Sequence, residues 1–166
     1  MSDALAVDHP FPDIDVVDPH GSPRRLRDEI GGRVAVVHFM RSSSCPVCLA
    51  HAAAMQRMKD AGEVGDAVLI LVAPGAAAEA ADAARRAAGR APSIRVRASV
   101  DGHERSGLTT TAFLQRSATV VVDPAGIIRD ARIAALPTAS FDADAVRAAL
   151  AWIAAQAWER SFEDGS

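Results

Sequence analysis

The chain has 166 residues, and its 49% hydrophobic and 23% charged residues are the balance of an ordinary globular protein with one buried core. Its net charge of -3 provides no basic field for nucleic acid. No apolar run approaches the roughly 20 residues of a membrane span, and the N-terminal segment 1–8 lacks the pattern of a secretory signal. We therefore expect a single domain over residues 1–166, located in the cytoplasm, without nucleic-acid or membrane partners.

The N-terminal third begins with a predicted hairpin. Residues 11–17 alternate like strand residues, and Asp18–Gly21 reads as the turn, where glycine supplies a positive φ. Residues 26–30 suit one helical turn that ends at a glycine pair. The nearly unbroken apolar run 34–40 then predicts a central strand buried on both faces.

A loop of small residues, 41–45, separates this strand from a predicted helix over residues 46–61. Pro46 suits the first helical turn because its missing N–H is not needed there, so Ser44 or Cys45 would be the N-cap. Further along, the pattern predicts a buried strand at 68–72, a helix over 75–88 and a strand at 94–100.

The last part of the chain begins with an irregular segment, 101–116, for which we expect a short helix and a loop. Residues 118–122 and 127–132 predict two strands joined by a turn at 123–126. A final amphipathic helix is expected over 141–158, with Asp142 as cap, a frayed tail at 161–166 and a core face formed by Val146, Leu150, Trp152 and Ile153.

Alternation of strands and helices predicts parallel strand pairs, and the late hairpin adds an antiparallel pair. The sequence therefore predicts an α/β fold in which a central mixed sheet lies between helices, an α/β/α sandwich.

The only two cysteines, Cys45 and Cys48, lie three residues apart where the central strand leads into a helix. A disulfide between them would close a small loop and stabilise the fold little. In a reducing compartment such a pair indicates redox chemistry or metal binding. A helix N-terminus favours a thiolate, which is the nucleophilic form, and the second sulfur can then resolve the product.

A metal site is the main alternative from the residues alone. Zinc needs four ligands, and the chain has no second cysteine pair. His38 on the strand and His51 on the helix are the residues that would have to complete the set. We expect His38 to be a core residue instead, and His51 to lie on the helix surface.

The segment Val36–Cys48 resembles the active-site strand and loop of redoxins and peroxiredoxin-like proteins of the AhpC/TSA type. Residues 10–13 and 18–21 follow the N-terminal hairpin of that family, and residues 118–129 resemble its paired strands after the active site. The resemblance spans most of the chain in the expected order. It implies a thioredoxin-like fold with an N-terminal β-hairpin extension.

The active-site motif departs from the family pattern Pro-x-x-x-Thr-x-x-Cys. When the pattern is aligned on Cys48, Cys45 stands at the threonine and Arg41 at the proline. By this resemblance Cys48 would attack peroxide and Cys45 would resolve; by analogy with thioredoxins the roles reverse. The sequence leaves the choice open. Peroxiredoxins also hold an arginine before the late strand, and Arg116 is the nearest candidate, so Arg41 and Arg116 are expected to stabilise a thiolate or bind peroxide.

The resemblance implies a thiol peroxidase that reduces hydroperoxides through a Cys45–Cys48 disulfide, without metal or organic cofactor. A thioredoxin-type or low-molecular-weight thiol would restore the pair, and a homodimer is compatible with this reading. A protein disulfide reductase and a non-enzymatic metal-binding or redox-sensing module remain as alternatives.

Overall fold

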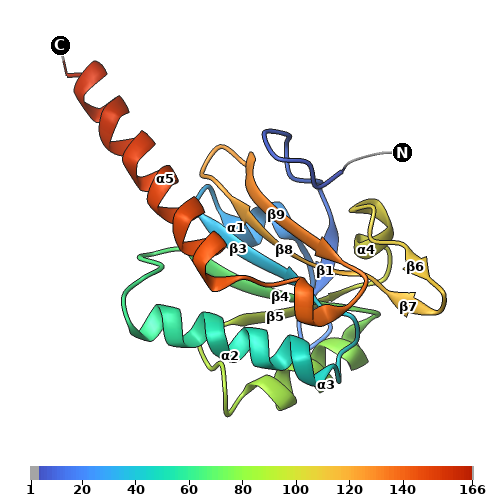
Figure 1. Cartoon of the computed structure of the whole chain (residues 1–166). Helices are drawn as coiled ribbons and strands as arrows, with labels where there is room; N and C mark the ends of the chain where they lie inside the picture. The colour runs from blue at the N-terminus through green and yellow to red at the C-terminus, as the bar shows by residue number, and fades with distance from the viewer. Residues whose placement is uncertain (1–3, 166) are drawn as a thin grey trace.

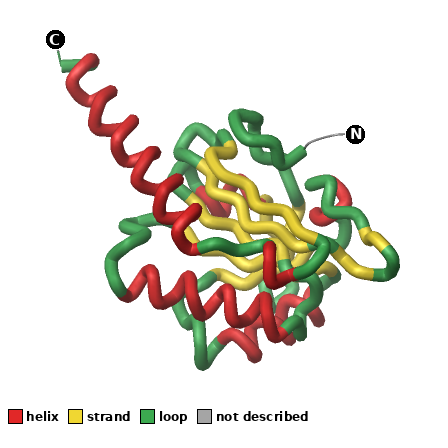
Figure 2. The backbone as a smooth tube through the Cα atoms, in the orientation of Figure 1, coloured by secondary structure: helices red, strands yellow, loops and turns green. Residues whose placement is uncertain are grey.

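A seven-stranded mixed sheet lies between two layers of helices (Figures 1 and 2). The computed structural model describes residues 4–165, so the first three residues of the N-terminal segment and the last residue of the predicted frayed tail lie outside it. The strands of this sheet, in spatial order, are β2 (Pro23–Arg25), β1 (Asp15–Val17), β5 (Arg95–Ser99), β4 (Val68–Pro74), β3 (Ala35–Phe39), β8 (Ser117–Val122) and β9 (Ile128–Ala134).

The helices divide between the two faces of the sheet. One face packs against the helices α2 (Pro46–Asp60), α3 (Ala77–Ala87) and α5 (Ala143–Glu163). The other face is covered by α1 (Leu26–Ile30), by the N-terminal segment and by Leu108, which follows α4 (Gly102–Arg105). The predicted α/β/α sandwich is therefore confirmed.

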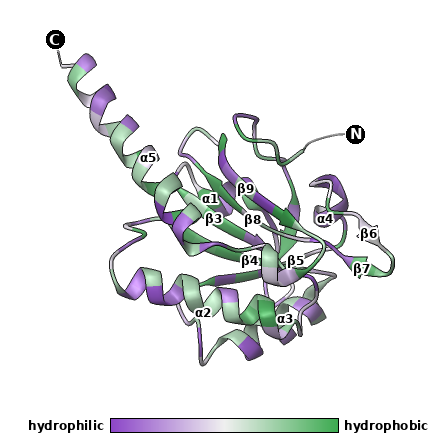
Figure 3. Ribbon diagram, in the orientation of Figure 1, coloured by the Kyte–Doolittle hydropathy of each residue, from purple (hydrophilic) through white to green (hydrophobic). Residues whose placement is uncertain are grey.

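Strand β3 lies in the interior of the sheet, between β4 and β8, and all of its residues are buried. It pairs in parallel with β4, with Val37 opposite Ile70, and antiparallel with β8, with Val37 opposite Val120. Its side chains alternate between the two hydrophobic clusters, which is why the segment reads as an unbroken apolar run. Figure 3 shows hydrophobic colour along β3 and β8, whereas hydrophilic colour recurs on the outer faces of the helices.

The predicted N-terminal hairpin is present as β1 and β2, which pair antiparallel around the expected turn. Gly21 has a φ of 88° there, the conformation for which the turn was assigned. A second hairpin within the irregular segment, β6 (Thr110–Thr111) with β7 (Leu114–Gln115), was not predicted. Its strands have two residues each, too few for a recognisable alternation.

Two expectations for α5 are wrong. Trp152 is 47% exposed and stacks under Arg129, whose guanidinium lies 5.0 Å from the ring centroid, so it does not belong to the core face with Val146 and Ile153. The helix also continues through residues 161–163 to Glu163, where a frayed tail was expected. No helix of the described chain is both long enough and apolar enough to cross a membrane.

Candidate active site

The cysteine pair lies where β3 ends and α2 begins. Pro46 occupies the first turn of α2 and Cys45 is its N-cap residue, as the sequence predicted. The sulfur of Cys45 accepts a hydrogen bond from the backbone N–H of Cys48 at 3.3 Å. The Cys45 sulfur thus serves as the capping acceptor of the helix, at the end where the partial positive charge of the helix stabilises an anion.

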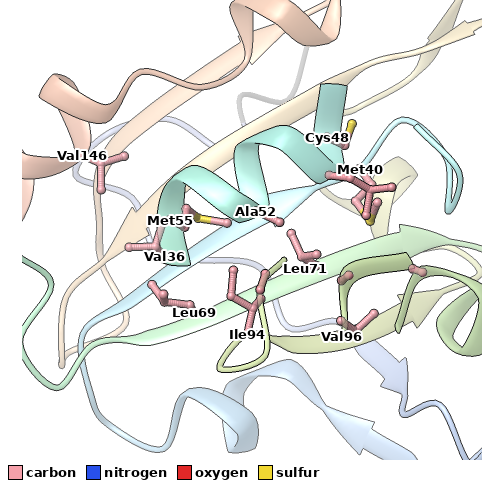
Figure 4. Packing of buried hydrophobic residues seen from close by; sticks show 14 of the residues in the cluster. Val36, Met40, Cys48, Ala52, Met55, Leu69, Leu71, Ile94, Val96 and Val146 are labelled. Atoms are coloured by element: carbon pink, nitrogen blue, oxygen red, sulfur yellow. The ribbon is translucent and has the colours of Figure 1, made fainter. Parts of the chain in front are cut away.

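The two sulfurs have different surroundings. Cys45 is 6% exposed, whereas Cys48 is 0% exposed and lies in the core beside Met40 (Figure 4). Burial, together with a hydrogen bond to Cys45, raises the pKa of the Cys48 thiol well above its ordinary value. The Cys48 sulfur also accepts the backbone N–H of Arg41 at 3.4 Å. Cys48 is therefore held as a buried thiol directly behind Cys45.

A cavity of about 440 Å³ opens over Cys45. Its walls come from the loop before α2, from the first turn of α2 and from two late segments: Arg41, Ser42, Ser44, Cys45, Pro46, Val47, Phe113, Gln115 and Pro137. Phe113, at the tip of the β6–β7 hairpin, is fully exposed and adopts a φ of 67°. The wall of the cavity thus contains one cysteine, a guanidinium, hydroxyl groups and an apolar rim.

The loop 41–44 is tied to α3. Ser43 Oγ donates a hydrogen bond of 2.8 Å to Asp82 Oδ2, and the same carboxylate accepts bonds from Arg85 and Arg86. These bonds hold the pKa of Asp82 below its usual range, the Ser43 hydroxyl contributing most. The loop that carries Arg41 to the cavity is therefore anchored from outside.

The two predicted arginines have different positions. Arg41 lines the cavity, and its positive charge favours the ionised form of Cys48, the weakest of the influences on that thiol. Arg116 lies half-buried between β7 and β8 and is not among the described residues that line the cavity. Its carbonyl accepts a hydrogen bond from Gln115. The structure thus brings Arg41 but not Arg116 to the wall around Cys45.

A buried hydrogen-bonded network runs behind the site. Thr119 Oγ1 donates to the carbonyl of Ser140 at 2.6 Å, so it accepts from His38 Nδ1 at 2.9 Å. His38 is fully buried, as expected of a core histidine. Burial lowers its pKa to about 3, so the ring is neutral and its Nε2 has no hydrogen-bond partner in the described structure.

The sequence suggested that His51 lies on the surface of the helix, but in the structure its side chain is packed against other elements. Its Nε2 donates to the carbonyl of Pro137 at 2.7 Å, and its ring stacks on Phe141 with centroids 5.0 Å apart. Pro137 begins the short 3₁₀ helix η1 (Pro137–Ala139), so His51 fastens this wall of the cavity to α2. Within residues 4–165 no three histidine, cysteine or acidic side chains are placed to hold a metal ion.

Three contributors to the site were not predicted from the sequence: Phe113, Gln115 and Pro137. They belong to short irregular segments, and only the pairing of β8 with β3 brings these segments to the cysteines. His103, which donates from Nε2 to the carbonyl of Met40 at 2.7 Å, was also missed.

Solved structures share this fold. The peroxidoxin BcpB from Mycobacterium tuberculosis has a TM-score of 0.70 at 18% identity, over 90% of this chain and 98% of that one. A thiol peroxidase from Chromobacterium violaceum gives 0.75 at 18% identity, over 91% and 89%. Reduced Prx3 from Vibrio vulnificus, solved in complex with hydrogen peroxide, gives 0.71 at 16% identity, over 88% and 99%. These similarities confirm the thioredoxin-like fold.

No curated protein matches the chain significantly. A family model, however, matches residues 7–131, which include the N-terminal hairpin, both cysteines and the paired strands β8 and β9 up to Ala131. The chain therefore belongs to the AhpC/TSA family, the peroxiredoxin-like family of thiol oxidoreductases that its sequence resembles.

Proposed function

We propose that the protein reduces hydroperoxides through a disulfide between Cys45 and Cys48, with Cys45 as the attacking thiol. The observation that carries this assignment is the contrast between the two sulfurs. Cys45 faces the cavity at the N-terminus of α2, whereas Cys48 is 0% exposed behind it. This order of attack is the reverse of the one implied by aligning Cys48 with the last cysteine of the family pattern.

The chemistry balances with these two thiols alone. The Cys45 thiolate attacks one peroxide oxygen, the O–O bond breaks, and the leaving oxygen takes a proton to become water or an alcohol. Cys45 is now a sulfenic acid. The Cys48 sulfur then attacks the Cys45 sulfur, the S–O bond breaks, and the Cys48 proton leaves with the hydroxide as a second product, water. The thiols lose two electrons and the peroxide gains them.

The raised pKa of Cys48 suits the second role. A buried thiol that stays protonated does not compete for the peroxide, and its proton is available to the hydroxide that leaves Cys45. In the reduced protein the backbone N–H of Cys48 donates to the Cys45 sulfur, so the two residues are adjacent before oxidation begins.

Regeneration requires an external thiol, and the same geometry selects the sulfur that it attacks. Because Cys48 is inaccessible, a thioredoxin-type protein or a small thiol reaches the disulfide at Cys45 and releases Cys48 as the leaving thiol. The cavity over Cys45 has that cysteine, and not Cys48, in its wall, which gives the reductant a path to the Cys45 sulfur.

The test is one equivalent of hydrogen peroxide added to the reduced protein, followed by titration of free thiols and intact mass measurement. We expect both thiols to disappear, the mass to fall by two hydrogens, and a dithiol reductant to reverse both changes. Thiols that survive peroxide but are consumed by the disulfides of insulin would show a disulfide reductase instead. Thiols that survive both reagents would contradict redox catalysis.

A further inference from the structure

The outer half of α5 presents apolar side chains that the rest of the described chain does not cover. From Ala154 to Glu163 every residue except the half-buried Gln156 is exposed, and the helix projects away from the sheet in Figure 1. Trp158 is 67% exposed and Phe162 is 60% exposed. Their rings contact each other edge to face, with centroids 4.9 Å apart, so they form one aromatic knob.

The knob continues a stripe of small residues along the same helix. Ala151, Ala155, Trp158 and Phe162 follow one another at spacings of four, three and four, which places them on one face. This spacing is that of a seam between two paired helices. The residues that α5 buries against the sheet, Val146, Ala149 and Ile153, belong to a different face.

A socket lies beside the inner end of this stripe. A cavity of about 390 Å³ opens between α5 and the α2–β4 loop, and its apolar walls include Val34, Val64, Leu150, Ala151, Ala154 and Ala157. A cavity of this size lies in the range that holds compact organic ligands, so it can accept an aromatic ring. The small alanine side chains leave the room that a bulky side chain would fill.

The knob and the socket cannot meet within one chain. The knob lies on the same continuous helix that forms one wall of the socket, and Phe162 is eight residues, or about 12 Å, beyond Ala154 along its axis. Two copies of the chain solve this problem if their α5 helices run antiparallel, because each knob then reaches the socket of the other copy. Two displaced, complementary patches on one surface are what a two-fold symmetric interface requires.

We propose that two copies of this chain associate through antiparallel α5 helices, with Trp158 and Phe162 of each copy packed against the alanine stripe and socket of the other. The aromatic pairs and the walls that they cover bury roughly 1,000 Å² in total, which is the lower limit for a specific interface. The dimer is therefore expected to dissociate on dilution. This interface does not involve the cavity over Cys45, and the proposal does not depend on the proposed function.

The first measurement is sedimentation equilibrium of the full chain across a concentration series. We expect the mass of two chains at high concentration and of one chain at low concentration. Trp158→Ala/Phe162→Ala should remain a monomer throughout, and Ala154→Trp, which fills the socket but keeps the knob, should weaken association as strongly. All three positions are exposed, so circular dichroism should show a folded protein in each case.

Trp152→Ala is the matched control. This exposed tryptophan lies on the same helix but stacks on Arg129 of its own chain, so its loss should leave the dimer intact. In a Trp152→Phe background, Trp158 is the remaining tryptophan, and its emission should shift to shorter wavelength as concentration rises.

Two results would overturn the proposal. One is a wild-type mass of a single chain at every concentration up to about 1 mM, where even a very weak complex forms. The other is a dimer that survives both the double variant and Ala154→Trp. A monomer that binds phosphatidylglycerol vesicles through Trp158 and Phe162 would give the first of these results and assign the knob to a lipid surface.

Discussion

Cys45 and Cys48 lie three residues apart, yet one turn of helix gives them opposite properties. The N-cap position turns the Cys45 sulfur toward the cavity, and the first turn of α2 directs Cys48 into the core between α2 and β3. The difference between the thiols therefore follows from where the helix begins, which Pro46 fixes.

Arg41 and Arg116 offer a matched pair of variants. We expect Arg41→Ala to slow the reaction of Cys45 with peroxide about fivefold to tenfold, because a cation beside a reacting anion contributes about 1 kcal/mol in water-like surroundings. Arg116→Ala should react at the wild-type rate, since Arg116 is not among the described lining residues. Stopped-flow rates with hydrogen peroxide check both, and equal slowing in the two variants would disprove the distinction.

The raised pKa of Cys48 predicts a loss of stability in alkali. The unfolded thiol ionises near its ordinary pKa of 9.0, whereas the folded protein keeps the proton. Above pH 9 the unfolded state therefore binds fewer protons, and the free energy of unfolding falls by up to about 1.4 kcal/mol per pH unit.

Urea denaturation between pH 8 and pH 10 measures this effect under reducing conditions. Cys48→Ala is the reference because it lacks the titrating group, and the chain has no tyrosine to obscure the comparison. Wild type should lose about 1 kcal/mol relative to the variant by pH 10. Parallel pH profiles for the two proteins would mean that Cys48 is not held as a thiol.

At the scale of elements, the strands and helices around the cysteines were predictable from the sequence, but the opposite wall of the cavity over Cys45 was not. The apolar run of β3, Pro46 at the start of α2 and the Cys45 cap are local signals, each read within a few residues. Phe113 and Pro137 line the same cavity as Cys45 because the sheet places β8 beside β3. No local pattern in the sequence encodes that arrangement.

The same reason explains the errors at His51 and Trp152. Helical periodicity places His51 on the outer side of α2, but η1 packs there and supplies the Pro137 carbonyl. Trp152 looks like a core residue because it is large and apolar, yet the face that α5 buries is narrow and ends at Ile153. Packing between distant elements decided both positions.

His51 should therefore contribute to stability, because its side chain links α2 to η1. His51→Ala removes a hydrogen bond and an aromatic stack, and it leaves the Pro137 carbonyl with the Ser140 hydroxyl as its side-chain partner. We expect the free energy of unfolding to fall by about 1–3 kcal/mol in urea denaturation. His20→Ala, in the exposed β1–β2 turn, should change it by less than about 0.5 kcal/mol. A His51 variant as stable as the His20 variant would contradict this role.

For the whole molecule, the buried histidines predict sensitivity to acid. Burial lowers the pKa of His38 to about 3 and that of His103 to about 4. Below pH 6.5 the two histidines bind protons in the unfolded chain but stay neutral in the folded protein. The free energy of unfolding therefore falls with falling pH, by up to about 1.4 kcal/mol per pH unit for each histidine.

Denaturation of wild type and His103→Gln between pH 7 and pH 4.5 checks this prediction. The variant should lose stability less steeply than wild type, because one of the two groups no longer titrates. If both proteins show the same slope, His103 is protonated in the folded state and its burial does not control acid stability.

The measurement that tests the central claim most directly is chemical trapping of the first oxidised sulfur. Reduced Cys48→Ser and Cys45→Ser proteins are each mixed with one equivalent of hydrogen peroxide in the presence of dimedone, and the adduct is located by mass spectrometry. We predict rapid formation of a dimedone adduct on Cys45 in Cys48→Ser and slow or no reaction in Cys45→Ser. A rapid adduct on Cys48 in the Cys45→Ser protein, with an unreactive Cys45 in the other variant, would contradict the assignment and restore the order of attack implied by the family motif.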